Sequence, residues 1–231
     1  GGTVVRKIVL PIGKREEEVL LPEDKILYDI HGNPAAEKES IAEAALEAIR
    51  NPIGTKPLKE LVAKGEKIAV VVSDITRMVG TAEFLPVLIN ELNEAGIADS
   101  DITIIIATGT HRAHTPEEDV VVCGQDIVNR IKIHQHDCRN KEELVDMGVT
   151  SFGTPILIDK YAAEADKVII TGSVSLHPMA AFGGGRKAVM PGISGYATIM
   201  HNHAMALADK VGEGCNPACE TSVKIIRCMK I

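Results

Sequence analysis

Three short, almost wholly apolar segments constrain the fold of this chain more than any other feature. Residues 67–72, 102–107 and 167–171 are rich in Val and Ile and carry too few polar side chains to face water on one side. Between them lie segments with the spacing of amphipathic helices, such as residues 84–95, which end at Gly96. This alternation predicts an α/β fold: a mostly parallel, Rossmann-like sheet with helices on both faces.

The remaining elements are predicted from caps, periodicity and breakers. Thr115, followed by Pro116 and then Glu118, marks a helix start with a threonine cap and a glutamate three positions on. The helix at residues 141–147 is expected to end at Gly148. Further helices are expected at residues 40–50, 57–64 and 194–208, and further strands at residues 131–136 and 155–158.

The two ends of the chain differ from this central pattern. Residues 4–10 and 18–21 are β-prone runs around Gly13 and Lys14, which predicts a short β-hairpin ahead of the sheet. Residues 209–219 contain Gly and Pro and have the composition of a linker. We therefore expect one α/β domain at 1–209. Residues 210–231 are expected to be a linker and the start of a further, C-terminal domain.

Composition excludes several classes of protein. The 231 residues include 25 Lys and Arg against 32 Asp and Glu, a net charge of −7, which argues against nucleic acid as a partner. Aromatic residues make up only 3%, without Trp, so no stacking platform for single-stranded nucleic acid is expected. No apolar run approaches the roughly 18 residues of a membrane span. Five Cys without a Cys-x-x-Cys pair predict a reduced, cytoplasmic protein.

Polar side chains follow each of the three apolar segments. The clusters are Ser73-Asp74-Ile75-Thr76-Arg77, Thr108-Gly109-Thr110-His111-Arg112 and Gly172-Ser173-Val174-Ser175-Leu176-His177-Pro178. In an open parallel sheet, ligands bind beyond the carboxyl ends of the strands. We therefore expect Asp74, Arg77, His111 and His177 to meet in one site, although a single histidine after a strand is more often a turn residue than a catalyst. His114 is expected to be a loop residue.

A glycine-rich segment, Gly183-Gly184-Gly185-Arg186-Lys187, follows these clusters. Glycines let a backbone approach a ligand closely, but the spacing matches neither a phosphate-binding loop nor a dinucleotide-binding fingerprint. We interpret the segment as an anion cradle beside a reactive lysine, because a neighbouring cation such as Arg186 lowers the pKa of Lys187 and favours its free amine. The alternative is a surface turn that carries two solvated cations.

Other histidines and one cysteine are candidates for metal binding. His201 and His203 lie about 200° apart around a helix, so they cannot both face one site. His134, His136 and Cys138 share a face of a predicted strand. One rigid strand seldom surrounds a tetrahedral ion, so structural hydrogen bonding at the strand end is the expected role of His136-Asp137.

Taken together, these segments resemble the N-terminal domain of the nickel-dependent lactate racemase family. The likeness runs from about residue 5 to about residue 209, and both order and spacing fit. Besides the three clusters up to His177, the matching stretches are Gly184-Gly185-Arg186-Lys187, Pro191-Gly192-Ile193, Asn202-His203, Asn51-Pro52-Ile53-Gly54 and residues 150–155. One departure follows Arg77, where Met78-Val79-Gly80 stands in place of the family's usual prolines.

The resemblance implies a specific cofactor. Members of the family carry a nickel-pincer mononucleotide, the pyridinium-3-thioamide-5-thiocarboxylic acid mononucleotide with nickel. The resemblance implies that Lys187 attaches it covalently and that His203 ligates the nickel. It implies that His111 and His177 are the acid/base catalysts and that Arg77 binds the substrate. The other cofactor-binding positions that it implies are Asp74, Thr76, Gly184, Gly185 and Arg186.

The implied activity is racemisation or epimerisation of a small, lactate-like 2-hydroxy acid by hydride transfer. The α-proton of such a substrate is a poor acid, so hydride loss is the easier route, and histidine can exchange the hydroxyl proton near neutral pH. Family members carry a second α/β domain that closes the cleft, so we expect this chain to need one. Two other functions stay open: a non-catalytic nucleotide- or anion-binding module, and a metal-dependent hydrolase, although no His-x-x-x-His motif supports the latter.

Overall fold

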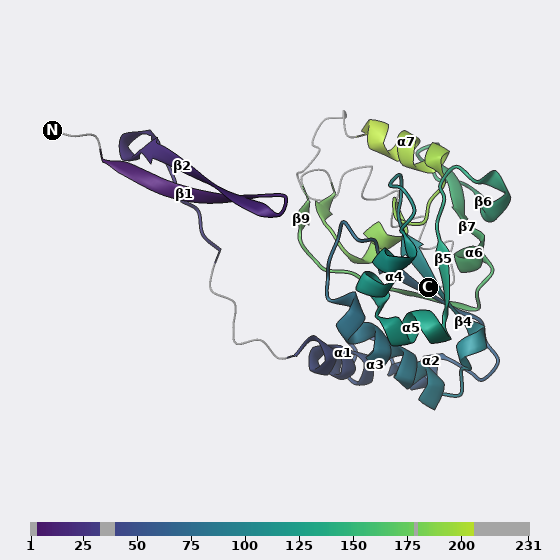
Figure 1. Ribbon diagram of the computed structural model, residues 1–231. Coiled ribbons are helices and arrows are strands. Elements are labelled where there is room, and N and C mark those ends of the chain that lie inside the picture. Colours follow the sequence, from purple (N-terminus) through teal and green to yellow (C-terminus); the bar gives the residue numbers. More distant parts are fainter. Residues whose placement is uncertain (1–3, 33–39, 178–179, 206–231) are drawn as a thin grey trace. The chain divides into compact units, whose positions relative to one another are not determined.

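The computed structural model describes residues 4–32, 40–177 and 180–205 (Figure 1). The chain divides into two compact units, residues 1–38 and residues 39–231, and each is described by itself. Within the described ranges, no helix has the length and apolar character needed to cross a lipid bilayer.

The first unit is a two-stranded antiparallel hairpin. Strands β1 (Val5–Ile12) and β2 (Arg15–Pro22) pair along their whole length, and a 3-10 helix, η1 (Glu23–Lys25), follows. Gly13 adopts a φ of +63° at the turn, a conformation that glycine reaches without strain. The hairpin predicted ahead of the sheet is confirmed.

A four-stranded parallel sheet forms the centre of the second unit. Its strands are β3 (Ile68–Ser73), β4 (Ile102–Ala107), β5 (Lys132–Gln135) and β8 (Lys167–Ile170), in the order β5-β4-β3-β8. The three apolar segments are β3, β4 and β8, and β3 and β4 are the inner strands. The chain moves outward from β3 to β5 and then returns to the other side of β3. Such a reversal of strand order opens a crevice at the carboxyl ends of the strands.

Five helices cover one face of this sheet and lie together in Figure 1. They are α1 (Ile41–Arg50), α2 (Leu58–Leu61), α3 (Thr81–Glu94), α4 (Pro116–Cys123) and α5 (Gln125–Arg130). Their apolar side chains pack against alternate residues of the inner strands, including Val70, Val72 and Ile104. The α/β class with a parallel sheet is confirmed.

The opposite face has a different cover. A four-residue helix, α6 (Lys160–Ala163), lies there with strand β7 (Pro155–Asp159) and residues 188–193, packed against Ala69, Val71 and Ile105. Helical residues therefore lie on both faces, but on this side they share the cover with a strand and a loop.

One predicted element is wrong. The helix expected at residues 141–147 is replaced by a single 3-10 turn, η3 (Lys141–Glu143), and a strand, β6 (Leu144–Val149). This strand pairs antiparallel with β7, with Leu144 opposite Asp159. In so short a segment, local spacing does not separate helix from strand. The partner strand decides, because it satisfies the backbone hydrogen bonds.

Short elements complete the second unit. They are η2 (Asp99–Asp101), β9 (Leu176–His177), β10 (Ala181–Phe182), η4 (Gly185–Ala188) and α7 (Tyr196–Ala204). Strands β9 and β10 pair antiparallel. The end of the helix predicted at residues 194–208 and the linker expected at 210–231 lie outside the described residues, as does Pro178.

Candidate functional site

A cavity of about 470 Å³ opens at the carboxyl ends of β3, β4 and β8. It contains residues from the loops after these strands, from the glycine-rich segment and from α7. Among the candidate residues, those that line it are Asp74, Arg77, His111, His177, Gly184, Lys187 and His203. The loops that follow the three strands therefore meet at one cavity. Thr76, Gly185 and Arg186 are not among the lining residues.

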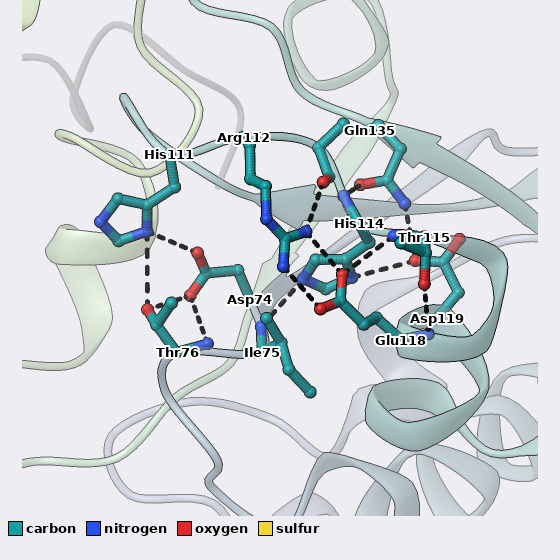
Figure 2. A network of polar contacts seen from close by, with 11 residues as sticks. Asp74, Ile75, Thr76, His111, Arg112, His114, Thr115, Glu118, Asp119 and Gln135 are labelled. Carbon is teal, nitrogen blue, oxygen red and sulfur yellow. Dashed lines mark hydrogen bonds and ion pairs between the residues drawn. The ribbon is translucent and has the colours of Figure 1, made fainter. Parts of the chain in front are cut away.

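Asp74 and His111 form a hydrogen-bonded pair (Figure 2). Nδ1 of His111 lies 2.6 Å from Oδ2 of Asp74, whose side chain is 3% exposed. Thr76 donates to the other oxygen, Oδ1, from its backbone N–H at 3.2 Å and from its hydroxyl at 2.7 Å. An ionised carboxylate only accepts hydrogen bonds, so Nδ1 of His111 carries the proton. The neutral ring then offers Nε2 as a proton acceptor.

His177 lines the same cavity but is held differently. Its Nδ1 accepts the backbone N–H of Ala180 at 3.1 Å, so in the neutral ring the proton is on Nε2. Burial lowers the pKa of His177, and the positive charges of Lys187 and Arg77 lower it further. The neutral form of His177 therefore donates through Nε2, whereas the neutral form of His111 accepts there.

The glycine-rich segment passes close to the loop after β8. Gly184 has a φ of +73°, and a Cβ at that position would lie 2.7 Å from the carbonyl oxygen of Ser173. The N–H of Gly183 donates to the carbonyl of Ser175 at 2.7 Å. Gly184 must therefore be glycine, because a side chain would be strained and would collide with backbone. This close approach brings η4, and with it Lys187, to the cavity.

Lys187 lines the cavity, and its neighbour Arg186 does not. Burial lowers the pKa of Lys187, and the positive charges of Arg186 and Arg77 lower it further. Nη2 of Arg186 donates to the carbonyl of Ala180 at 2.8 Å, and its buried Nε has no hydrogen-bond acceptor among the described residues. The expected effect of an adjacent cation on Lys187 is therefore present, although Arg186 acts from outside the cavity wall.

Helix α7 separates its two histidines, as helical geometry predicts. His203 lines the cavity, where burial and then the charge of Lys187 lower its pKa. Nδ1 of His201 instead lies 3.0 Å from the hydroxyl of Thr154. In the described part of the chain, no three His, Cys, Asp or Glu side chains cluster as metal ligands. A metal in this cavity would therefore meet the imidazole of His203 rather than a complete cluster of protein ligands.

His134 and His136 bind a carboxylate. Both rings contact Oδ2 of Asp159, at 2.8 Å and 2.9 Å, and the other ring nitrogen of His136 lies 3.0 Å from the carbonyl oxygen of Ser194. Burial by itself would raise the pKa of Asp159, but the hydrogen bonds from the two histidines outweigh it and the pKa is lowered. The structural hydrogen bonding expected of His136 is confirmed. Cys138 is a buried free thiol.

Some residues that line the site stand outside the predicted catalytic and binding set. Val79 and Leu176 add apolar surface to the cavity. Gly192 lines it next to Gly109, whose N–H donates to the Gly192 carbonyl at 2.9 Å. His114 lies in a loop as expected, but its side chain is only 1% exposed. Apolar and backbone contributions of this kind become visible only when the loops are placed in space.

A family model and two similar proteins of known family all indicate the same family for this chain. The family model described as the lactate racemase N-terminal domain matches residues 12–214. The lactate racemase of Thermoanaerobacterium thermosaccharolyticum is 34% identical over 198 residues, which cover 85% of this chain and 46% of that protein. The lactate racemase of Lactiplantibacillus plantarum is 39% identical over 172 residues, which cover 74% and 39% respectively.

Solved structures agree with this result. The lactate racemase apoprotein from Thermoanaerobacterium thermosaccharolyticum is similar with a TM-score of 0.82 at 32% identity, over 98% of this chain and 54% of that one. A protein from Thermotoga maritima, with a TM-score of 0.69, 24% identity and coverage of 87% and 49%, shows the same fold. The chain spans about half the length of these relatives, or somewhat less. Because the family model covers most of its residues, the chain belongs to the lactate racemase family and corresponds to its N-terminal domain.

Proposed function

We propose that residues 1–209 form the cofactor-binding and catalytic domain of a nickel-pincer-dependent racemase or epimerase. Its substrate is a small, lactate-like 2-hydroxy acid. The observation that carries the proposal is the content of one cavity. It holds the imidazoles of His111 and His177 as opposite tautomers, together with a guanidinium and a partly buried amine. The name lactate racemase, which both curated relatives bear, supports the substrate class.

The residues present fit the nickel-pincer mononucleotide. Lys187 is a cavity amine with a lowered pKa, as covalent attachment requires. Gly184 keeps the adjoining backbone clear of side-chain atoms. Arg186 adds a positive charge beside this turn from outside the cavity wall, which favours an anionic group there. The imidazole of His203 is a ligand type that suits nickel, so His203 would hold the metal.

The chain's own side chains account for proton transfer and substrate binding. The cofactor held by these residues would supply hydride-transfer chemistry at the α-carbon of the substrate. Arg77 holds the substrate carboxylate with two parallel hydrogen bonds. Nε2 of His111 takes the hydroxyl proton, and Asp74 on Nδ1 stabilises the imidazolium that forms. Removal of the hydroxyl proton promotes departure of the α-hydrogen as hydride, and the two losses together leave a planar carbonyl that can regain hydride on either face.

His177 is the second acid/base group, for the enantiomer whose hydroxyl lies on the other side. In its neutral form, Nε2–H can hold the substrate oxygen by a hydrogen bond. To take a proton at Nε2, the ring must first release the amide of Ala180 and move its own proton to Nδ1. The two directions of the reaction therefore start from different tautomers. His111 can accept a proton at Nε2 directly, whereas His177 must first change its tautomer.

The half of the relatives that this chain does not span is proposed to complete the site. In this proposal, residues 210–231 lead into a second domain that closes over the cavity. Cys123 and Cys138 support a reducing, cytoplasmic setting, since both are buried free thiols and burial raises the pKa of Cys123 to about 12.

Intact mass and nickel content test this proposal directly. The chain is expressed together with the enzymes that build the cofactor, with the Thermoanaerobacterium racemase as positive control. We expect an adduct of mononucleotide mass on Lys187 and nickel in equimolar amount. Lys187→Arg keeps the charge but lacks the primary amine, so it should lose the adduct. His203→Ala should keep the adduct and lose most of the nickel.

A second version of the chain, extended by the missing half of a relative, is tested in parallel and assayed for conversion of D-lactate to L-lactate. His111→Ala should abolish conversion of at least one enantiomer. If the control loads while both versions of this chain gain neither adduct nor nickel, the chain is a binding module and the racemase proposal is wrong.

A further inference from the structure

Behind the Asp74–His111 pair lies another histidine, whose ring is buried. The side chain of His114 is 1% exposed and is not among the residues that line the cavity. Its Nε2 accepts the backbone N–H of Ile75 at 2.9 Å, and its Nδ1 lies 3.0 Å from Oδ1 of Asp119 on α4. Figure 2 shows the ring between these two partners.

These contacts define the protonation state of His114. A backbone N–H can only donate, so Nε2 must hold a lone pair and the proton must be on Nδ1, which donates to Asp119. Gln135 of β5 closes the network. Its amide nitrogen donates to Oδ1 of Asp119 at 2.6 Å, and its amide oxygen accepts the backbone N–H of His114 at 3.1 Å. A neutral imidazole is thus held from both sides.

The Ile75 amide matters because of the turn to which it belongs. The N–H of Arg77 donates to the carbonyl of Asp74 at 2.9 Å, which closes a β-turn with Ile75 at its second position. This hydrogen bond does not use the Ile75 N–H, and a partly buried N–H needs an acceptor. His114 is that acceptor. The first residue of the same turn supplies the carboxylate that binds Nδ1 of His111.

We propose that His114 is a positioning residue for His111. By accepting the Ile75 N–H, the neutral ring of His114 fixes the turn after β3, so that Asp74 faces Nδ1 of His111 and Nε2 is left as the proton acceptor. Asp119 keeps the proton of His114 on Nδ1. The statement that His111 is a catalytic base rests on the proposed function, whereas the link from His114 to the tautomer of His111 does not.

The loop after β4 is held by a contact that does not involve the side chain of His114. Loss of that side chain should therefore affect mainly the turn after β3. Both terminal nitrogens of Arg112 donate to the carboxylate of Glu118, each at 2.7 Å. This ion pair ties the loop that carries His111 to α4 without the His114 ring. Without His114, the turn after β3 loses the acceptor for its amide, while the loop after β4 keeps a second tie.

Two substitutions test the hydrogen-bond acceptor of His114, Nε2, separately from its donor, Nδ1. His114→Gln places an amide oxygen near the position of Nε2 and can still accept the Ile75 N–H, whereas His114→Asn reproduces only the donor to Asp119. Long-range 1H–15N spectra of the cofactor-free chain report which nitrogen of His111 is protonated. We expect protonated Nδ1 in the wild type and in H114Q, and mixed tautomers in H114N. The Ile75 amide should exchange about 5-fold faster, or more, in H114N than in H114Q.

The matched control is His134→Asn, which changes another buried histidine paired with an aspartate. It should leave the His111 spectrum unchanged. The proposal is overturned if folded H114N keeps both the wild-type tautomer of His111 and the protection of the Ile75 amide. If H114N does not fold, Asp119→Ala replaces it, because the ring of His114 then loses the partner that holds it against the Ile75 N–H. Unchanged His111 spectra in that variant overturn the proposal equally.

Kinetics of the longer, cofactor-loaded protein add an independent measurement. H114N should lower kcat by about 10-fold or more, because the base is displaced. KM should rise as well, because Arg77, which binds the substrate carboxylate, belongs to the same turn. If the spectra differ as expected but the wild type does not racemise its substrate, the proposed function fails and the positioning role stands. If the wild type racemises and the spectra do not differ, the positioning role fails alone.

Discussion

The ionisable side chains of this site form two sets: one contains a carboxylate paired with a histidine, and the other contains groups surrounded by positive charge. Asp74 is paired with His111 at one part of the wall. Lys187 and His177, by contrast, have pKa values lowered by burial and by neighbouring positive charge. The neighbouring charges that lower the pKa of Lys187 are both positive, Arg186 and Arg77. This side of the cavity is therefore suited to an anion, and a 2-hydroxy carboxylate or a nucleotide phosphate carries the required charge.

The amine of Lys187 should be unusually reactive for a lysine. Trace acetylation at pH 8, quantified by mass spectrometry against Lys141 on the surface, measures the fraction of free amine. Because Arg186 lowers the pKa of Lys187, Arg186→Gln should raise that pKa and slow acetylation of Lys187 by roughly 2- to 5-fold. Arg186→Lys keeps the positive charge and should label almost as fast as the wild type. Equal rates in the Gln and Lys variants would show that the charge of Arg186 has no part in the effect.

Among the elements, α4 links the sheet edge to the site. Its start was predictable: the Thr115 hydroxyl accepts the N–H of Glu118 at 3.3 Å, and the Glu118 carboxylate accepts the N–H of Thr115 at 2.9 Å. Hydrogen bonds to Glu118, from Arg112 first and then from the Thr115 backbone, lower its pKa to about 2. One turn of helix thus caps itself, holds Arg112 and presents Asp119 to His114.

Removal of the cap should weaken this element measurably. Thr115→Ala loses the side-chain acceptor and should reduce the free energy of unfolding by about 1 kcal/mol in urea titrations. Thr115→Ser retains a hydroxyl and should stay within a few tenths of a kcal/mol of the wild type. If the Ser and Ala variants are equally unstable, the methyl group of Thr115 rather than its hydroxyl stabilises the start of α4.

At the scale of the whole molecule, a buried carboxylate connects the two layers. Asp159, at the end of β7, accepts hydrogen bonds from His134 and His136 at the end of β5, and His136 reaches Ser194. Asp159 also accepts the N–H of Tyr161 at the start of α6. These contacts join the edge of the parallel sheet to the cover of its second face, beside the segment that leads into α7.

Stability should therefore depend on the ionisation of Asp159. Its folded-state pKa is lowered, so the stabilisation is present above the ordinary value of about 3.9 and is lost as the pH falls below it. At pH 7, Asp159→Asn should cost roughly 2 to 4 kcal/mol in unfolding free energy. The difference in unfolding free energy between the wild type and D159N should be smaller at pH 3 than at pH 7. Asp126→Asn, on the exposed side of α5, is the control and should show no such narrowing; a gap in D159N that is independent of pH would contradict this account.

The sequence was sufficient to predict those features that depend on residues close together in the chain. Runs of Val and Ile predict buried strands, so β3, β4 and β8 follow from composition, and the polar residues that end them predict a shared site. The cap at Thr115 and the separation of His201 from His203 depend only on residues a few positions apart. In each case the physical cause acts within one element.

Tertiary structure alone decided the order β5-β4-β3-β8, the strand β6 where a helix was expected, and the position of Arg186 outside the cavity wall. It also decided the contacts of Asp74 with His111 and of Ile75 with His114, which join residues 37 and 39 positions apart. Such features depend on which distant backbone group satisfies a hydrogen bond or which charge lies nearby, and no local periodicity carries that information. The sequence by itself determined the strands and the chemistry at their ends, and folding decided how those residues act on one another.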